Sequence, residues 1–284
     1  MNSIINKRLP GIIMCIVLPL SVVACSSQSS LQSSQSLSIE EPPSISAVSK
    51  MELDGFDTPE EAVKAYLEGL KAADPDQMIG TFAVERYAEN YDFEANLDRL
   101  KVYVPTQDIK FPNANAFVSK LNVESRRIAV TNAIIRQYLA ICYPEFDQSF
   151  PVMLNDGAED FSALLVEKLN TVDLDSMTLS GFIPPESLAE TYTVKRNQEN
   201  MARQAKVYGA EKIVSLVAVF ELQGNKYMLC SDVISYNGKW FMLQFGGNIG
   251  ALLSISPYYA GIIPLSVPGI AEEFSGALES LIAP

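Results

Sequence analysis

The chain has 284 residues, with 34 Asp and Glu against 21 Lys and Arg, which gives a formal net charge of −13. This excess of negative charge argues against nucleic acid as a partner, because phosphate backbones are repelled. The chain contains no histidine, which excludes Ser-His-Asp and Cys-His nucleophilic sites and histidine-ligated zinc or haem. We expect neither a metal nor another cofactor, and any catalysis would depend on Asp, Glu, Tyr, Lys or Cys.

Residues 1–24 have the layout of a secretory signal peptide. Lys7 and Arg8 give a positive start, and Gly11–Val23 is an uncharged apolar run that is short for a membrane span. The closing letters VVAC, which end at Cys25, resemble the bacterial lipobox. The resemblance implies that Cys25 is acylated and holds the protein on the outer face of a bacterial envelope membrane. The alternative is a plain secretory signal with an incidental cysteine.

Residues 25–50 predict a flexible tether. Eleven serines lie between Ser26 and Lys50, together with two prolines and few large apolar residues, so this stretch cannot bury enough surface to offset the entropy of ordering it. A bare linker and a glycosylated stalk both fit this composition. Residues 51–284 are expected to form a single α+β domain.

A helical hairpin should open this domain. Thr58 and Glu61 form a capping box around Pro59, and apolar residues follow at helical spacing. Asp74-Pro75 repeats the start signal for a second, shorter helix.

Near the end of the chain, three strand-length runs predict an antiparallel meander: Ile213–Leu222, Tyr227–Tyr236 and Trp240–Phe245. Gly224-Asn225 and Asn237-Gly238 are expected to form two-residue turns between them. Both faces of the meander are apolar, so we expect cover on both sides.

The regions around the meander are expected to supply that cover. Helical periodicity dominates the middle of the chain, with apolar stripes at Ile128, Ala133, Ile134, Tyr138 and Ile141, and at Phe161, Leu164, Leu165 and Leu169. We expect a strand over Val172–Ile183, one long helix from Pro184 to Gly209, cover for the second sheet face from Gly246–Ala271, and a short amphipathic helix at the end.

Thr58–Ala83 resembles the opening helical hairpin of nuclear-transport-factor-2-like domains, which occur in small bacterial lipoproteins and in accessory domains of penicillin-binding proteins. Asn237–Gly247 resembles the last strands of the same cystatin-like cone. The resemblance implies an α+β fold in which helices pack on a curved antiparallel sheet. Between Phe93 and Gly209 this chain carries far more helix than the minimal fold, so a large helical elaboration is expected in the middle.

Asp232 is the candidate for acid–base chemistry. The predicted turns place it between Val217 and Leu243 on an apolar face, where burial would raise its pKa. The resemblance implies that such an acid works with tyrosines in an apolar cone, so Asp232, Tyr227, Tyr236 and Cys230 form the predicted pocket. The alternative, which we favour, is a structural carboxylate satisfied by nearby donors.

The cysteines and two acidic runs are further candidates for a structural or binding role. Cys142 and Cys230 either form a disulfide or are two buried free thiols. The acidic runs at Asp156–Asp160 and at Asp173 with Asp175 do not follow the twelve-residue calcium loop and are expected to be solvated.

Two functional hypotheses follow, and a purely structural spacer is a third. The first is a lipid-anchored binding or envelope-assembly module whose partner is a small ligand or an envelope protein. The second is a small enzyme of the isomerase or dehydratase kind that uses Asp232 and a tyrosine. The absence of histidine favours the first.

Membrane attachment through Cys25 is directly testable. In the bacterial envelope, Cys25→Ser should release the protein from the membrane fraction or leave it uncleaved, because serine offers no thiol for the lipid. Detergent-phase partitioning of the wild type and the variant measures this. Unchanged partitioning of the variant would contradict the prediction.

Overall fold

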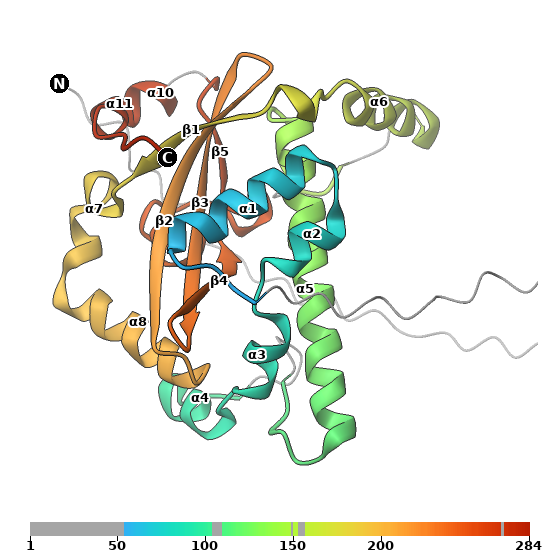
Figure 1. Cartoon of the computed structure of the whole chain (residues 1–284). Helices are drawn as coiled ribbons and strands as arrows, with labels where there is room; N and C mark the ends of the chain where they lie inside the picture. The colour runs from blue at the N-terminus through green and yellow to red at the C-terminus, as the bar shows by residue number, and fades with distance from the viewer. Residues whose placement is uncertain (1–53, 104–109, 149, 153–156, 268–269) are drawn as a thin grey trace, which may run out of the picture. The chain divides into compact units, whose positions relative to one another are not determined.

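The computed structural model describes residues 54–103, 110–148, 150–152, 157–267 and 270–284 (Figure 1). They belong to one compact unit, which extends from Ser49 to Pro284. The predicted signal peptide and the whole of the predicted tether, including Cys25, lie outside the described residues. Among the helices that the structure describes, none is both long and apolar enough to span a bilayer.

A five-stranded antiparallel sheet forms the centre of this unit, in the order β1-β2-β3-β4. The fifth strand shares an edge of β3 with β4, so that β4 pairs with the second half of β3 and β5 pairs with the first half. The strands are β1 (Thr178–Ile183), β2 (Lys212–Leu222), β3 (Asn225–Tyr236), β4 (Lys239–Phe245) and β5 (Ile262–Pro264).

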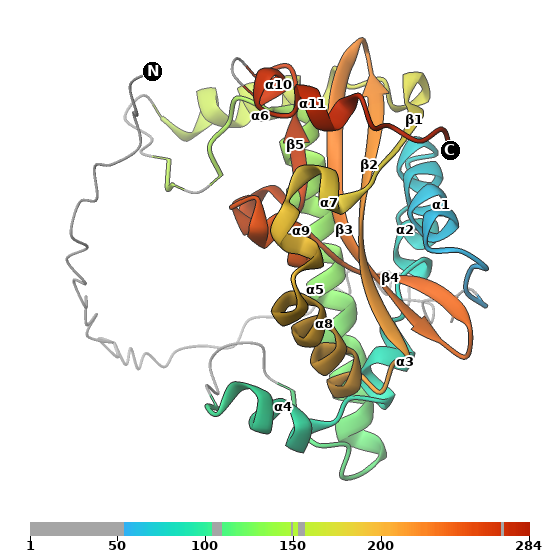
Figure 2. The same cartoon turned by 90° about the vertical axis from the view of Figure 1, so that its left-hand side faces the viewer.

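Helical segments cover both faces of the sheet, and Figure 2 shows β2 and β3 curving between them. One face packs against α1 (Pro59–Lys71), α2 (Pro75–Gly80) and α5 (Ala116–Cys142). The other face packs against α3 (Val84–Glu89), α8 (Lys195–Val207), α9 (Gly247–Leu252) and α11 (Ser275–Leu278). The remaining segments are α4 (Phe93–Leu100), α6 (Ala158–Asn170), α7 (Pro185–Leu188), α10 (Ile270–Glu273), η1 (Leu174–Ser176), η2 (Glu190–Thr193) and η3 (Pro257–Tyr259). The fold class, with helices on a curved antiparallel sheet and additional helix in the middle, is confirmed.

The opening hairpin begins as its sequence predicts. The Thr58 hydroxyl accepts from the Glu61 amide at 3.2 Å, and the Glu61 carboxylate accepts from the Thr58 amide at 3.2 Å. At the second helix the Asp74 carboxylate accepts from the Gln77 amide at 2.9 Å. These bonds satisfy amides that the first turn of a helix leaves without partners.

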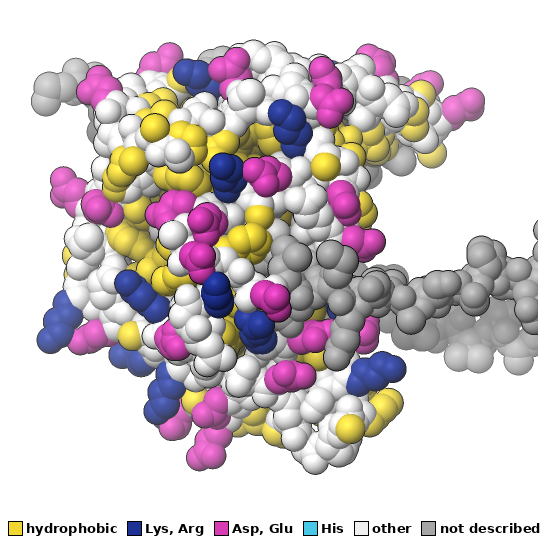
Figure 3. All heavy atoms as spheres, in the orientation of Figure 1, with side chains coloured by type: hydrophobic (Ala, Val, Ile, Leu, Met, Phe, Trp, Pro, Cys, Tyr) yellow, Lys and Arg dark blue, Asp and Glu magenta, His cyan; other side chains and the backbone are white. Residues whose placement is uncertain are grey.

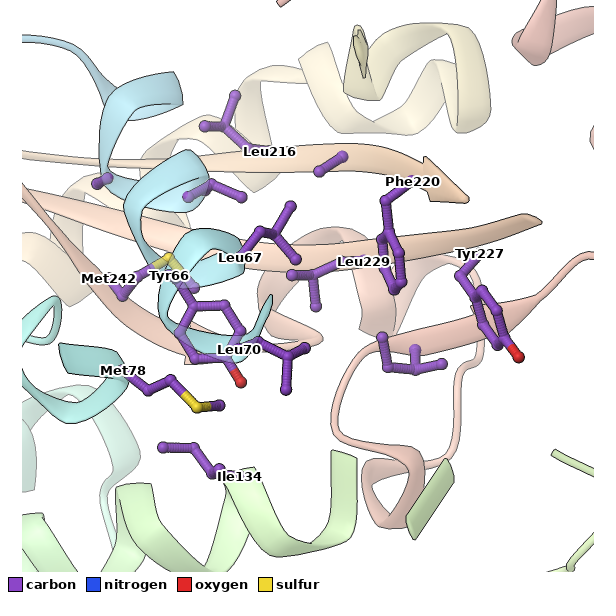
Figure 4. Close-up of a cluster of buried hydrophobic side chains, with 14 of the residues drawn as sticks. Tyr66, Leu67, Leu70, Met78, Ile134, Leu216, Phe220, Tyr227, Leu229 and Met242 are labelled. Atoms are coloured by element: carbon purple, nitrogen blue, oxygen red, sulfur yellow. The ribbon is translucent and has the colours of Figure 1, made fainter. Parts of the chain in front are cut away.

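The space between α1 and the sheet is filled by side chains (Figure 4). Tyr66 of α1 is fully buried, and its ring meets Phe82 at 6.0 Å and Phe245 at 5.1 Å between centroids. Leu67 and Leu70 point from the same helix toward the strands. Aromatic and leucine side chains therefore occupy the region between α1 and the strands.

The predicted register of β2 against β3 is wrong by two residues. The turn consists of Gln223 and Gly224, both with positive φ (51° and 77°), so it begins one residue earlier than predicted. The Gln223 amide donates to the Ser176 hydroxyl at 3.2 Å, and its side chain donates to the Thr171 carbonyl at 3.1 Å. These contacts come from a distant segment and are invisible to local turn chemistry. Asp232 consequently lies opposite Ser215, not Val217.

The second turn, Asn237-Gly238, forms where it was predicted. A bulge follows in β4, with Leu243 as its extra residue, so that Asp232 lies opposite Gln244 instead of Leu243. An extra residue moves every later side chain to the other face. Phe245 therefore packs against Tyr66, on the face of the sheet opposite to that of Asp232.

Three other expectations need correction. The strand expected over Val172–Ile183 begins only at Thr178, after η1. The single helix expected from Pro184 to Gly209 is divided into α7, η2 and α8, because Ala189 and Val194 have non-helical ψ angles of 103° and 133°. The expected terminal helix is divided into α10 and α11. Within Gly246–Ala271, α9 covers the second sheet face as expected, and β5 adds an unpredicted strand.

Candidate functional site

Asp232 of β3 is fully buried, and both of its carboxylate oxygens accept hydrogen bonds. The Ser215 hydroxyl donates to Oδ1 at 2.6 Å, and the Gln244 amide donates to Oδ2 at 3.0 Å. Asn248 donates to Oδ2 twice, from its backbone at 3.0 Å and from its side chain at 2.9 Å. The donors come from β2, β4 and α9, so this one carboxylate joins three neighbouring elements to β3.

The close approach of α9 to Asp232 depends on Gly247. This residue has φ +56°, and a Cβ placed on it would lie 2.2 Å from the Asp232 carboxyl carbon. Glycine is therefore required both for the backbone conformation and for the space. The carboxylate binds the first turn of α9, where unpaired amides favour negative charge. Each carboxylate oxygen of Asp232 is thus satisfied by donors within the protein, as buried polar groups generally are.

Complete burial raises the pKa of Asp232 from 3.8 to about 6, although the bonds from Ser215, Gln244 and Asn248 act in the opposite direction. Desolvation disfavours the ionised form, and the donors favour it. The site thus holds a carboxyl group that changes protonation state in mildly acidic conditions.

The other residues of the predicted pocket are only partly brought together. Cys230 shares the face of Asp232 and is fully buried, and burial together with the Asp232 charge raises the pKa of its thiol to about 12. Tyr236 shares that face too, but its hydroxyl donates to the Tyr208 carbonyl at 2.9 Å. Tyr227 lies on the opposite face, stacked on Phe220 at 5.3 Å.

No disulfide joins Cys142 to Cys230, because both thiols are free and buried. Cys142 is the last residue of α5, and burial raises the pKa of its thiol to about 11. In the described part of the chain, no cluster of three or more His, Cys, Asp or Glu side chains has an arrangement that could hold a metal ion.

A more accessible site is an apolar groove between the opening hairpin, α5 and α6, which we call the α5–α6 groove. It has a volume of about 480 Å³, and none of its lining residues is charged. It is lined by Leu70, Ala73, Pro75, Met78, Ile134, Ile135, Tyr138, Leu139, Leu165, Leu169 and Leu174. In Figure 3 hydrophobic side chains are visible along α6, at the upper right.

The groove is open because α6 is only loosely packed. No residue of α6 is buried, and Ile135 on the facing helix is 61% exposed. The helix is held near its ends. The ring centroids of Phe161 and Phe146 are 6.2 Å apart, and the Tyr138 hydroxyl donates to the Leu169 carbonyl at 3.3 Å. The sequence predicted the apolar stripe of α6, but periodicity gives no signal that the stripe would stay uncovered.

Comparison with protein-family models gave no match, and comparison with curated proteins gave none either. Among solved structures, a cystatin-like protein from Ruminococcus gnavus ATCC 29149 is similar, with 15% identity and a TM-score of 0.40. The similarity covers 80% of this chain and 47% of that one, so this chain spans about half of that protein's length. A neighbour this distant gives no information about a ligand, and the functional inference depends on the cavities of this chain.

Two substitutions at position 232 test the structural role. In Asp232→Asn the amide can turn its oxygen toward Gln244 and Asn248 while the Ser215 hydroxyl accepts from its nitrogen, so the free energy of unfolding at pH 7 should change by less than about 1 kcal/mol. Asp232→Ala leaves the donors of Gln244 and Asn248 unpaired and should cost about 1–3 kcal/mol. Urea unfolding of both variants measures this, and a stabilised Asp232→Ala would contradict the structural role.

The raised pKa also predicts a pH dependence. The folded state binds the Asp232 proton more tightly than the unfolded state, so this stabilising contribution is complete below pH 3.8 and is lost as the pH rises through about 6. Between pH 4 and pH 7 the free energy of unfolding of the wild type should therefore fall by roughly 2 kcal/mol relative to that of Asp232→Asn. Unfolding curves of both proteins at each pH provide the measurement, and a constant difference would show that the pKa of Asp232 is not raised by folding.

Proposed function

We propose that the chain is a lipid-anchored, extracytoplasmic binding module that holds an apolar ligand in the α5–α6 groove. The anchor is Cys25, and the ligand is of the acyl-chain kind, elongated and uncharged along the part that the groove encloses. The single observation that carries the ligand class is an open groove without a charged lining residue.

The size and composition of the groove support this proposal. Its volume of about 480 Å³ lies within the range of roughly 300–1,000 Å³ that is typical of small-molecule sites. The only polar group of its lining side chains is the Tyr138 hydroxyl, which already donates to the Leu169 carbonyl. A ligand that buries apolar surface there is favoured by about 25 cal/mol for each Å² removed from water.

Acid–base catalysis at Asp232 is the weaker alternative. The carboxylate is completely buried and accepts bonds from Ser215, Gln244 and Asn248. None of the residues in the predicted pocket lines the α5–α6 groove. A general acid or base must come within hydrogen-bond reach of its substrate, so we favour binding over catalysis.

A paired substitution on α6 tests the groove. Leu165 lines it, whereas its neighbour Val166 is 54% exposed and does not. The uncharged dye N-phenyl-1-naphthylamine should bind the wild type with enhanced fluorescence, and palmitate should displace it. Leu165→Asn should weaken the binding of the dye at least fivefold, because a polar amide then faces the apolar ligand.

Val166→Asn is the matched control, because it makes a comparable change on the same helix outside the groove. It should bind the dye as the wild type does. Equal weakening in both variants, or no saturable dye binding to the wild type, would contradict the proposal.

A further inference from the structure

We infer that a second, small cavity between α5 and the end of β4 binds a carboxylate anion that bears a short apolar group. This cavity, which we call the arginine cavity, has a volume of about 120 Å³. It is lined by Phe82, Arg126, Ala129, Val130, Ala133, Arg136, Leu243, Gln244, Phe245, Pro257 and Ala260. It shares no residue with the α5–α6 groove.

The charge of α5 differs from that of the rest of the chain. This helix carries four basic residues and one acidic residue, Glu124, in a protein with 13 more acids than bases. Glu124 lies 4.0 Å from Arg127, which is not part of the cavity. Residues three and four positions from Arg126 and Arg136 along the helix are uncharged, so no ion pair at helical spacing is available to them.

Arg126 and Arg136 accordingly have no carboxylate partner in the part of the chain that the structure describes. Arg126 donates from Nη2 to the Leu243 carbonyl and lies 4.3 Å from the centroid of Tyr87, but its Nε is buried without a hydrogen-bond partner. Arg136 lies 6.0 Å from the centroid of Tyr258. A buried donor without an acceptor is costly, and an anion in the cavity would supply the acceptor.

The remaining lining favours a carboxylate over phosphate. Apart from the arginines, Gln244 has the only polar side chain of the cavity, and its amide nitrogen donates to Asp232. Phosphate would therefore leave oxygens without donors in an apolar surrounding. A carboxylate has two oxygens that a planar guanidinium can bind in parallel. Its apolar part would contact Val130, Leu243 and Phe245.

Titration calorimetry of the full chain tests this inference with butyrate, butan-1-ol and inorganic phosphate at equal ionic strength and pH 7. Butyrate should bind saturably and at least tenfold more tightly than butan-1-ol or phosphate. Arg136→Gln should weaken the binding of butyrate at least tenfold, and so should Arg126→Gln. Arg127→Gln removes the same charge from the adjacent position and should bind butyrate as the wild type does.

Arg136 is exposed and makes no hydrogen bond through its side chain among the described residues, so Arg136→Gln decides the test if Arg126→Gln does not fold. Equal affinity for butyrate and butan-1-ol would show an apolar cavity only. Phosphate binding as tight as butyrate would overturn the carboxylate class. Equal weakening by Arg127→Gln would show a general effect of charge, and no binding of butyrate would overturn the site itself.

Discussion

The structure depends on one constraint, which is that β3 is apolar on both of its faces. Every residue of β3 from Tyr227 to Tyr236 is buried. An antiparallel strand of this kind cannot leave one face in water, so the chain must provide two separate covers. The opening hairpin and α5 provide one, and α8, α9 and the C-terminal segment provide the other. The apolar residues on both faces of β3 are therefore the reason why helices cover both sides of the sheet.

A carboxylate in the middle of such a strand requires compensation, because an ionised group without partners is very unfavourable in an apolar interior. The compensation involves two irregular features, one in the sheet and one at the start of α9. The bulge at Leu243 brings Gln244 opposite Asp232, and the left-handed Gly247 lets the start of α9 approach within hydrogen-bond distance. Asp232 thus connects the end of β4 to the beginning of α9.

Local rules predicted much of this fold, and they failed where distant contacts decide. The capping box of Thr58, the turn at Asn237-Gly238 and the two apolar faces of the meander were all readable from neighbouring residues. The turn at Gln223 was not, because Thr171 and Ser176 hold it from another part of the chain. The bulge at Leu243 could not be predicted either, because β4 contains no Gly, Asn or Pro that would indicate an irregularity. Asp232 was recognised as a buried polar group, but its partners could not be named from the wrong register.

The candidate sites were harder to predict because they depend on which side chains of a helix remain uncovered by other elements. The 27-residue helix α5 has a weak overall apolar stripe because it serves two surfaces with different parts of its length. Ile135 and Leu139 face the α5–α6 groove, whereas Arg126 and Ala129 face the arginine cavity. The arginines had a signal in the sequence, namely basic residues without an acid at helical spacing in an acidic chain. The space between α1 and the sheet is filled, and it is the helical elaboration outside that core which creates cavities open to a ligand.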